Sequence, residues 1–70
     1  MLSERGIESE WVNRTIAKPD SLEPDPAREN VFRAYLAIAE RQERVLRVVY
    51  SRDETQIRVI TAFFDRARRR

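Results

Sequence analysis

Hydrophobic residues recur at helical spacing near the start of the chain. Between residues 5 and 20 they stand three and four positions apart, which places them along one stripe of a helix. The stripe consists of Ile7, Trp11, Val12, Thr15 and Ile16. Glu8 occupies the cap position and Pro19 ends the predicted helix. The segment 19–30 holds three prolines and four acidic residues, a composition that predicts a loop.

The second half of the chain shows the spacing of strands. Two runs of β-branched and aromatic residues, 45–50 and 57–64, predict a pair of strands joined by the turn SRDETQ. The segment 31–44 has the composition of a helix, but its apolar residues also alternate at the period of a strand. Because a lone hairpin is only marginally stable, we interpret 31–39 as a third strand, followed by the turn ERQER.

These elements predict an α+β fold in one small domain, residues 1–70, with a basic C-terminal tail at 65–70. One N-terminal helix would pack on a three-stranded antiparallel sheet, or on a four-stranded one. Pairing Tyr50 with Ile57 and Ile38 with Leu46 sets the register and directs alternate side chains to the helix. The opposite side then receives Arg33, Tyr35, Arg47, Val49, Arg58, Ile60 and Phe64.

We call this side, which carries Arg33, Arg47 and Arg58, the arginine face. No carboxylate falls on it in the predicted register. One interpretation is an ordinary wet sheet face, where arginine stems cover apolar neighbours and the guanidinium groups stay in water. The other is a platform for RNA, with arginines on phosphates and Tyr35 or Phe64 stacked on a base.

The distribution of charge favours a polyanionic partner. The formal net charge is +2, but residues 1–30 hold four Lys/Arg against seven Asp/Glu, whereas residues 31–70 hold ten against five. The chain ends in DRARRR, which suits either a phosphate-binding arm or a solvated terminus. The residues predicted to bind RNA are Arg33, Tyr35, Arg47, Arg58, Arg66 and Arg68.

Several kinds of chemistry are excluded by composition. The chain has no cysteine and no histidine, so thiol nucleophiles, imidazole bases, disulfides and the usual zinc sites are absent. Its single glycine cannot form a glycine-rich phosphate loop. We expect no metal and no cofactor. The longest apolar run, AYLAIA, is too short to span a membrane, so we predict a soluble, cytoplasmic protein without membrane contact.

Four segments carry a family resemblance: ERGI at 4–7, KPD at 18–20, LRVVY at 46–50 and IRVIT at 57–61. In this order they resemble a small bacterial family, the domain of unknown function numbered 4258. The paired strand segments are also similar to BrnT-type toxins of the RelE-like ribonuclease superfamily. That resemblance implies a RelE-like α+β fold and a toxin that cleaves RNA and is neutralised by an antitoxin.

The resemblance also implies roles for individual residues. Arg47 and Arg58 would contact and stabilise the transferring phosphate, and Tyr35 or Tyr50 would donate a proton. The predicted register directs Tyr50 to the packed side, which argues against it, so no catalytic residue is assigned. Two hypotheses follow: a RelE/BrnT-like protein that acts on RNA, and a non-catalytic interaction module. The second would be a homodimer or bind another protein through an unpaired sheet edge.

Overall fold

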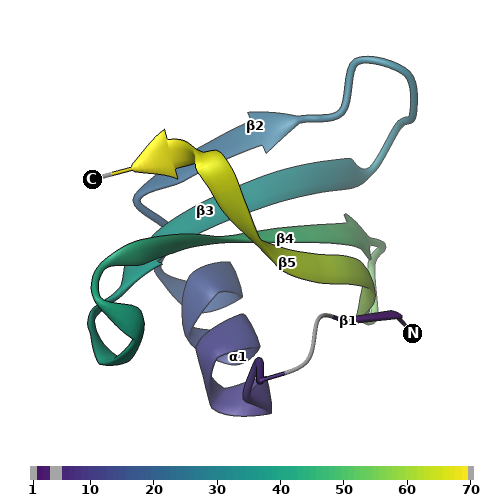
Figure 1. Cartoon of the computed structure of the whole chain (residues 1–70). Helices are drawn as coiled ribbons and strands as arrows, with labels where there is room; N and C mark the ends of the chain where they lie inside the picture. Colours follow the sequence, from purple (N-terminus) through teal and green to yellow (C-terminus); the bar gives the residue numbers. More distant parts are fainter. Residues whose placement is uncertain (1, 4–5, 70) are drawn as a thin grey trace.

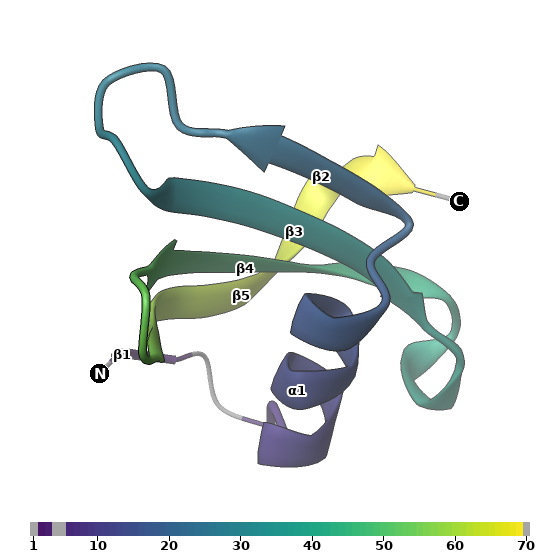
Figure 2. The same cartoon turned by 180° about the vertical axis from the view of Figure 1, so that it is seen from behind.

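The computed structural model describes the backbone at residues 2–3 and 6–69 and the side chains of residues 6–66. One helix packs on one face of a twisted sheet (Figures 1 and 2). The sheet order is β1-β5-β4-β3-β2; the strands from β2 to β5 are antiparallel, and β1 pairs with β5 in parallel. The elements are β1 (Leu2–Ser3), α1 (Ser9–Ala17), β2 (Ser21–Pro24), β3 (Val31–Ile38), the 3₁₀ turn η1 (Ala39–Arg41), β4 (Arg44–Arg52) and β5 (Ile57–Arg69).

The predicted helix is confirmed as α1. Glu8 is its N-cap residue, although the Glu8 side chain makes no capping hydrogen bond. Trp11 and Thr15 are buried beneath the helix, and the Thr15 hydroxyl donates a hydrogen bond of 2.7 Å to the Trp11 carbonyl one turn earlier. Helical geometry ends at Lys18, immediately before Pro19, whose ring would obstruct a further turn. The helix is therefore anchored by its apolar stripe more than by its caps.

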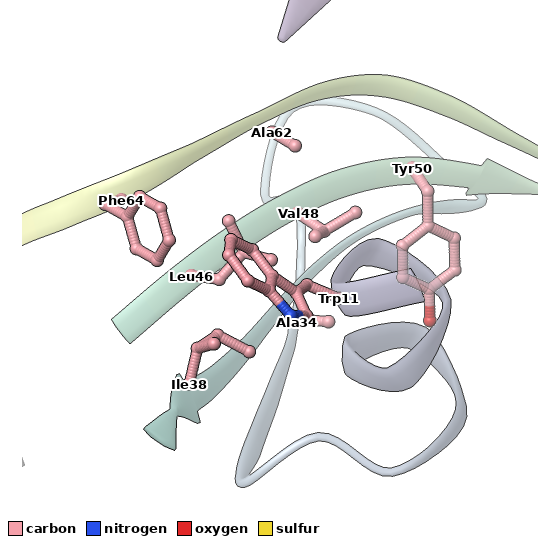
Figure 3. Packing of buried hydrophobic residues seen from close by; sticks show 8 residues of the cluster. All are labelled: Trp11, Ala34, Ile38, Leu46, Val48, Tyr50, Ala62 and Phe64. Carbon is pink, nitrogen blue, oxygen red and sulfur yellow. The ribbon is translucent and has the colours of Figure 1, made fainter. Parts of the chain in front are cut away.

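The main core lies between α1 and the sheet (Figure 3). Its fully buried centre is built from Ala34, Ile38, Leu46 and Val48, all at 0% exposure. Trp11 covers these residues from the helix and meets the Phe64 ring edge-on, with the ring centroids 6.3 Å apart. Alternate positions of β3 and β4 supply this face, as their period of two predicted. The predicted pairing of Ile38 with Leu46 is wrong by two residues: Ile38 lies opposite Arg44, because the turn is closed early by a hydrogen bond from the Glu43 N–H to the Ile38 carbonyl. The segment 31–38 is a strand, so the helical alternative for it is wrong.

The predicted register between β4 and β5 is wrong by two residues. Tyr50 lies opposite Val59, and it is Arg52 that lies opposite Ile57. The reason is a turn of only four residues, closed by Asp53, whose Oδ1 accepts hydrogen bonds of 2.8 Å from the backbone N–H groups of Thr55 and Gln56. An Asx turn of this kind competes with the longer loop that the sequence suggested, and β4 continues to Arg52.

A β-bulge in β5 changes the side to which its later residues point. Val49 pairs with Thr61 and the next residue, Tyr50, pairs with Val59, so Ile60 has no partner of its own on β4. Beyond the bulge, Phe64 pairs with Leu46 and enters the core, and Phe63 pairs with Arg47 on the other side. The prediction that Phe64 lies on the arginine face is therefore wrong.

Two strands were not predicted individually. β2 lies in the proline-rich segment expected to be a loop, and it tolerates Pro24 because it is an edge strand. With β2 the antiparallel part of the sheet has four strands, the larger of the two predicted numbers. β1 adds two residues beside β5 at Thr61 and Ala62.

β5 is longer than predicted and runs through residues 65–69, where the basic tail was expected. Its final part crosses in front of β3 in Figure 1 and behind β3 in Figure 2, on the side away from α1. The face opposite α1 is accordingly not uniformly wet. Four of its residues are less than 10% exposed: Val31, Tyr35, Val45 and Val49.

Candidate nucleic-acid interface

Arg33, Arg47 and Arg58 share the sheet face opposite α1. Residues directly opposite each other in antiparallel strands project to the same side. Arg33 of β3 lies opposite Val49 of β4, and Arg58 of β5 lies opposite Ser51. Val49 and Ser51 alternate with the core residues of β4 and project to the same side as Arg47. The register is wrong but the shared side is right, because a shift of two residues preserves the alternation.

Arg47 is the centre of the arginine face. It lies directly opposite Tyr35 on β3 and Phe63 on β5. Its guanidinium carbon is 5.9 Å from the Tyr35 ring centroid and 5.3 Å from that of Phe63, both within the range of cation–π attraction. Its Nη1 is 4.0 Å from Asp65 Oδ2, and 28% of the side chain is exposed. Nε is buried and has no hydrogen-bond partner in the described residues.

Carboxylates also lie on this face, contrary to the prediction. Glu23 of β2 is the cross-strand neighbour of Arg33, and Arg33 Nη2 is 4.0 Å from Asp25 Oδ2. Asp65 adds a third acidic group beside Arg47. The prediction failed because β2 and the last part of β5 were not recognised as neighbours of these arginines. Both ion pairs are longer than a hydrogen bond, so the guanidinium groups retain donors for a closer acceptor.

Asp25 is bound more closely by backbone N–H groups of its own loop than by Arg33. Its Oδ1 accepts hydrogen bonds of 2.8 Å and 3.2 Å from the backbone N–H groups of Ala27 and Arg28. These contacts hold the pKa of Asp25 below its ordinary value; the largest cause is the Ala27 N–H, and the Arg28 and Arg33 guanidinium groups add smaller attractions. Asp25 therefore organises its own loop and contacts Arg33 only secondarily.

The aromatic residues predicted to stack on bases are not available for stacking. Tyr35 is 4% exposed, and Phe64 is 8% exposed on the helix side. Tyr50, the other suggested proton donor, is also 4% exposed and belongs to the core. Phe63, which the sequence reasoning missed, stands beside Arg47 instead. The only signal for it was that two phenylalanines stand side by side at 63 and 64, and nothing in the sequence marks the bulge that decides which of them lies beside Arg47.

The model of the family described as DUF4258, a domain of unknown function, matches residues 1–64. The chain belongs to this family. No curated protein and no solved structure matches it. The comparisons therefore support the predicted membership of the DUF4258 family and give no support to the resemblance to RelE-like or BrnT-type toxins.

The remaining predicted RNA-binding residues of this DUF4258 chain lie on β5. Arg58 is exposed near the hairpin turn, where its charge makes a minor contribution to the lowered pKa of Asp53. The main cause of that lowering is the Thr55 backbone N–H. Arg66 is also exposed. Arg68 belongs to the β5 backbone, and its side chain lies outside the described ones.

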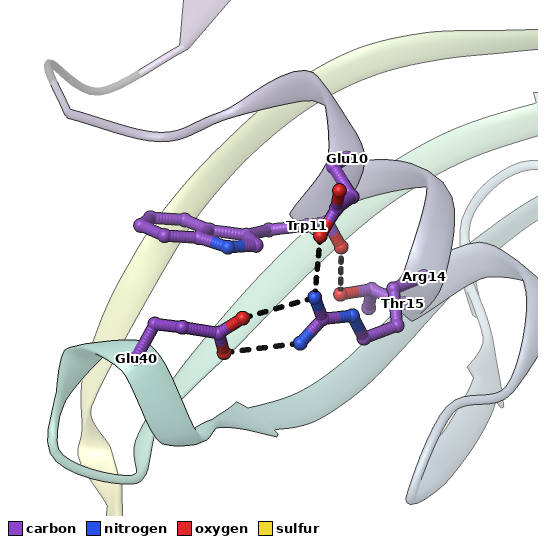
Figure 4. Close-up of polar contacts among 5 residues, drawn as sticks. All are labelled: Glu10, Trp11, Arg14, Thr15 and Glu40. Carbon is purple, nitrogen blue, oxygen red and sulfur yellow. Dashed lines mark hydrogen bonds and ion pairs between the residues drawn. The ribbon is translucent and has the colours of Figure 1, made fainter.

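A separate polar cluster on the helix side joins α1 to η1 (Figure 4). Arg14 Nη2 donates to Glu10 Oε2 at 2.6 Å, and the two terminal nitrogens of Arg14 donate to the two Glu40 carboxylate oxygens at 3.1 Å each. These bonds raise the pKa of Arg14, with Glu40 the largest cause, and lower the pKa of Glu40. This DUF4258 domain thus uses one arginine to fix the helix to the turn that follows β3.

The helix side of the DUF4258 domain also carries a groove of about 430 Å³ between α1 and the β4–β5 hairpin. Ile57 lies in its wall and is 47% exposed. In the part of the chain with described positions, no three acidic side chains gather as a metal site would require. None of the helical residues described there forms a segment long and apolar enough to cross a membrane.

Proposed function

We propose that this protein binds RNA through the arginine face. The observation that carries the proposal is the convergence of Arg33, Arg47 and Arg58 on one side of three adjacent strands. Along β4, Arg47 stands at position 47, Arg33 lies opposite position 49 and Arg58 lies opposite position 51. The three arginines are therefore offset from each other by two residues along the strand direction. At about 3.3 Å per residue, each step is about 7 Å along the strand direction, and Arg33 and Arg58 stand one strand to either side of Arg47, about 5 Å away across the sheet.

The environment of Arg47 supports this role. The guanidinium carbon is within cation–π range of both the Tyr35 and Phe63 rings, and Asp65, 4.0 Å away, is too distant to form a hydrogen bond with it. A phosphate oxygen at hydrogen-bonding distance would be a better acceptor, because charge-assisted bonds shorten to about 2.8 Å. Since no aromatic ring predicted for stacking is exposed, the contacts are to the RNA backbone and the binding is largely independent of sequence.

Salt-dependent binding of a labelled 12-nucleotide RNA tests the proposal. The three phosphate contacts of the arginine face contribute about −2 to the slope with which the logarithm of the association constant changes with the logarithm of salt concentration. Arg47→Gln should reduce that slope by about 0.7, the value expected for one contact on a single strand. Arg52→Gln is the matched control, because Arg52 is exposed on the same strand and pairs with Ile57 outside the arginine face.

Two results would contradict the proposal. One is an affinity that does not change with salt. The other is a variant with Arg33, Arg47 and Arg58 all replaced by glutamine that is folded and binds the RNA as tightly as the wild type. A DNA strand of the same length should bind with similar affinity, because the 2′-hydroxyl group is not required for phosphate contacts.

RNA cleavage would be an activity in addition to RNA binding. The proposal is limited to binding, because Tyr35 and Tyr50 are both 4% exposed and the chain has no histidine to move a proton. Expression in bacteria separates the two activities. Growth arrest with RNA cleavage, abolished by Arg47→Ala or Arg58→Ala, would establish a toxin activity and justify a search for an antitoxin. Normal growth with intact RNA would show that the protein binds RNA without cleaving it.

A homodimer is the second candidate, and the exposed apolar side chains on the helix side favour it. Ile57 is 47% exposed beside the groove formed with Ile16 and Ala17 of α1. A domain of this size gains stability from burying such a surface against a second copy. The mass in solution tests this: a dimer that becomes a monomer with Ile57→Asp supports the candidate, and a wild-type monomer at high concentration rejects it.

A further inference from the structure

Two arginines at the β3–β4 turn share one aromatic ring. Arg41 belongs to η1 and Arg44 is the first residue of β4. Their guanidinium carbons are 5.5 Å and 5.7 Å from the centroid of the Phe64 ring. Phe64 is 8% exposed, so the two side chains help to cover it. Covering a ring requires apolar stems, but it does not require two positive charges at the same place.

The charges of Arg41 and Arg44 are not neutralised within the described side chains. Neither forms an ion pair there, whereas Arg14, Arg28, Arg33 and Arg47 each have a carboxylate partner. The acidic residue adjacent to Arg41 is Glu40, and both of its carboxylate oxygens accept bonds from Arg14. Arg14 thus occupies Glu40, and Glu43, the acidic residue between Arg41 and Arg44 in the sequence, is exposed and forms no ion pair within the described side chains.

Two guanidinium groups that lie against the same ring, with no carboxylate partner among the described side chains, can direct several N–H donors to one acceptor. The ligand that fits them is therefore a group with several negatively charged oxygens, such as a phosphate.

The turn is close to the arginine face but on the other side of the sheet. Arg44 precedes Arg47 by three residues, about 10 Å along the strand. Because side chains alternate, Arg47 projects from the arginine face and Arg44 from the helix side. Guanidinium groups therefore lie on both sides of the sheet near the β3–β4 turn. An extended polyanion bound to Arg47 would meet Arg44 and then Arg41 if it were long enough to pass this turn.

We propose that Arg41 and Arg44 form a second phosphate-binding site, which takes the phosphates of an RNA strand that extends beyond the arginine face. This site rests on the proposed function, since it is defined as a continuation of RNA bound there. It makes affinity depend on RNA length. A strand of 4 nucleotides occupies the arginine face alone, and a strand of 12 nucleotides reaches both sites.

Binding of 4- and 12-nucleotide RNAs to the wild type and to R41Q/R44Q tests the inference. The double variant should bind the 12-nucleotide RNA about ten-fold more weakly, which corresponds to two exposed charge contacts, and should lose about 1.4 from the salt slope. Its affinity for the 4-nucleotide RNA should be unchanged. Arg52→Gln, at the far end of β4, should leave both affinities unchanged. Equal affinities of the folded double variant and the wild type for the 12-nucleotide RNA would overturn the inference.

Two further variants keep the outcomes distinct. If R41Q/R44Q does not fold, the single variants R41Q and R44Q decide the matter, each with an expected loss of about three-fold on the 12-nucleotide RNA. If Arg47→Gln and Arg58→Gln leave all affinities intact, the proposed function is wrong. In that case, loss of 12-nucleotide binding in R41Q/R44Q would show a phosphate site at the turn alone and would overturn its role as an extension.

Discussion

Replacing Arg47 with methionine separates a structural role of this arginine from a role in binding. Methionine keeps a flexible apolar chain between the Tyr35 and Phe63 rings and removes the guanidinium group. The variant loses two cation–π contacts, at about 0.5 to 1 kcal/mol each, and an ion pair to Asp65 that contributes up to about 1 kcal/mol. Because 28% of the Arg47 side chain is exposed to solvent, which screens these interactions, the losses lie toward the lower end of these ranges.

The same replacement also removes an unfavourable group. Nε of Arg47 is buried without a hydrogen-bond partner in the described residues, and an unsatisfied buried donor costs about 1 to 3 kcal/mol. Methionine sulfur adds contacts to aromatic rings of about 0.3 to 1.5 kcal/mol. Because the gains are as large as the losses, we expect the free energy of unfolding of Arg47→Met to stay within about 1 kcal/mol of the wild-type value.

Urea unfolding followed by the fluorescence of Trp11, the single tryptophan, measures this stability. RNA binding by the same variant should weaken and its salt slope should fall by about 0.7. Arg52→Met, on the same strand but outside the arginine face, should change neither quantity. A loss of more than about 2 kcal/mol in Arg47→Met together with unchanged RNA affinity would refute the reasoning, because it would show that the arginine serves the fold.

Three other predictions concern the fold. Leu46 is 0% exposed, and Leu46→Ala should lower the free energy of unfolding by about 2 to 5 kcal/mol, which is as much as a core of this size supplies. The circular dichroism of this variant at 25 °C should therefore be that of an unfolded chain. A cooperative unfolding transition at the wild-type midpoint would contradict this. The lowered pKa of Asp53 contributes stability that is present above its ordinary value and is lost as pH falls through the folded value. Unfolding free energy should therefore drop as pH falls below about 4, and less steeply in Asp53→Asn than in the wild type or in a Glu54→Gln control. Arg14→Gln frees Glu10 and Glu40, so it should lower the urea midpoint more at low salt than at high salt, whereas equal shifts would exclude an electrostatic link.

The parts of the fold that local spacing specifies could be predicted. The helix follows from the three- and four-residue spacing of Trp11 and its neighbours, and β3 and β4 follow from alternation. The shared side of Arg33, Arg47 and Arg58 was also predictable, because alternation depends on position along each strand and survives a register shift of two residues.

The candidate site was less predictable because its composition depends on residues distant in sequence. β2 brings Glu23 beside Arg33, and the bulge at Ile60 exchanges Phe64 for Phe63 beside Arg47. Both depend on backbone hydrogen bonds that almost any residue can make. The side chains of β2, an edge strand that contains proline, give no pattern from which its pairing with β3 could be predicted.

The sequence by itself determined the kinds of element, the core-facing positions of β3 and β4 and the excess of arginine in the second half of the chain. The tertiary structure alone decided which carboxylates and rings surround each arginine, and that Arg14 occupies Glu40 while Arg41 and Arg44 lie against the Phe64 ring. The physical reason is range: periodicity acts between residues a few positions apart, whereas strand register and charge pairing join residues that only the folded chain brings together.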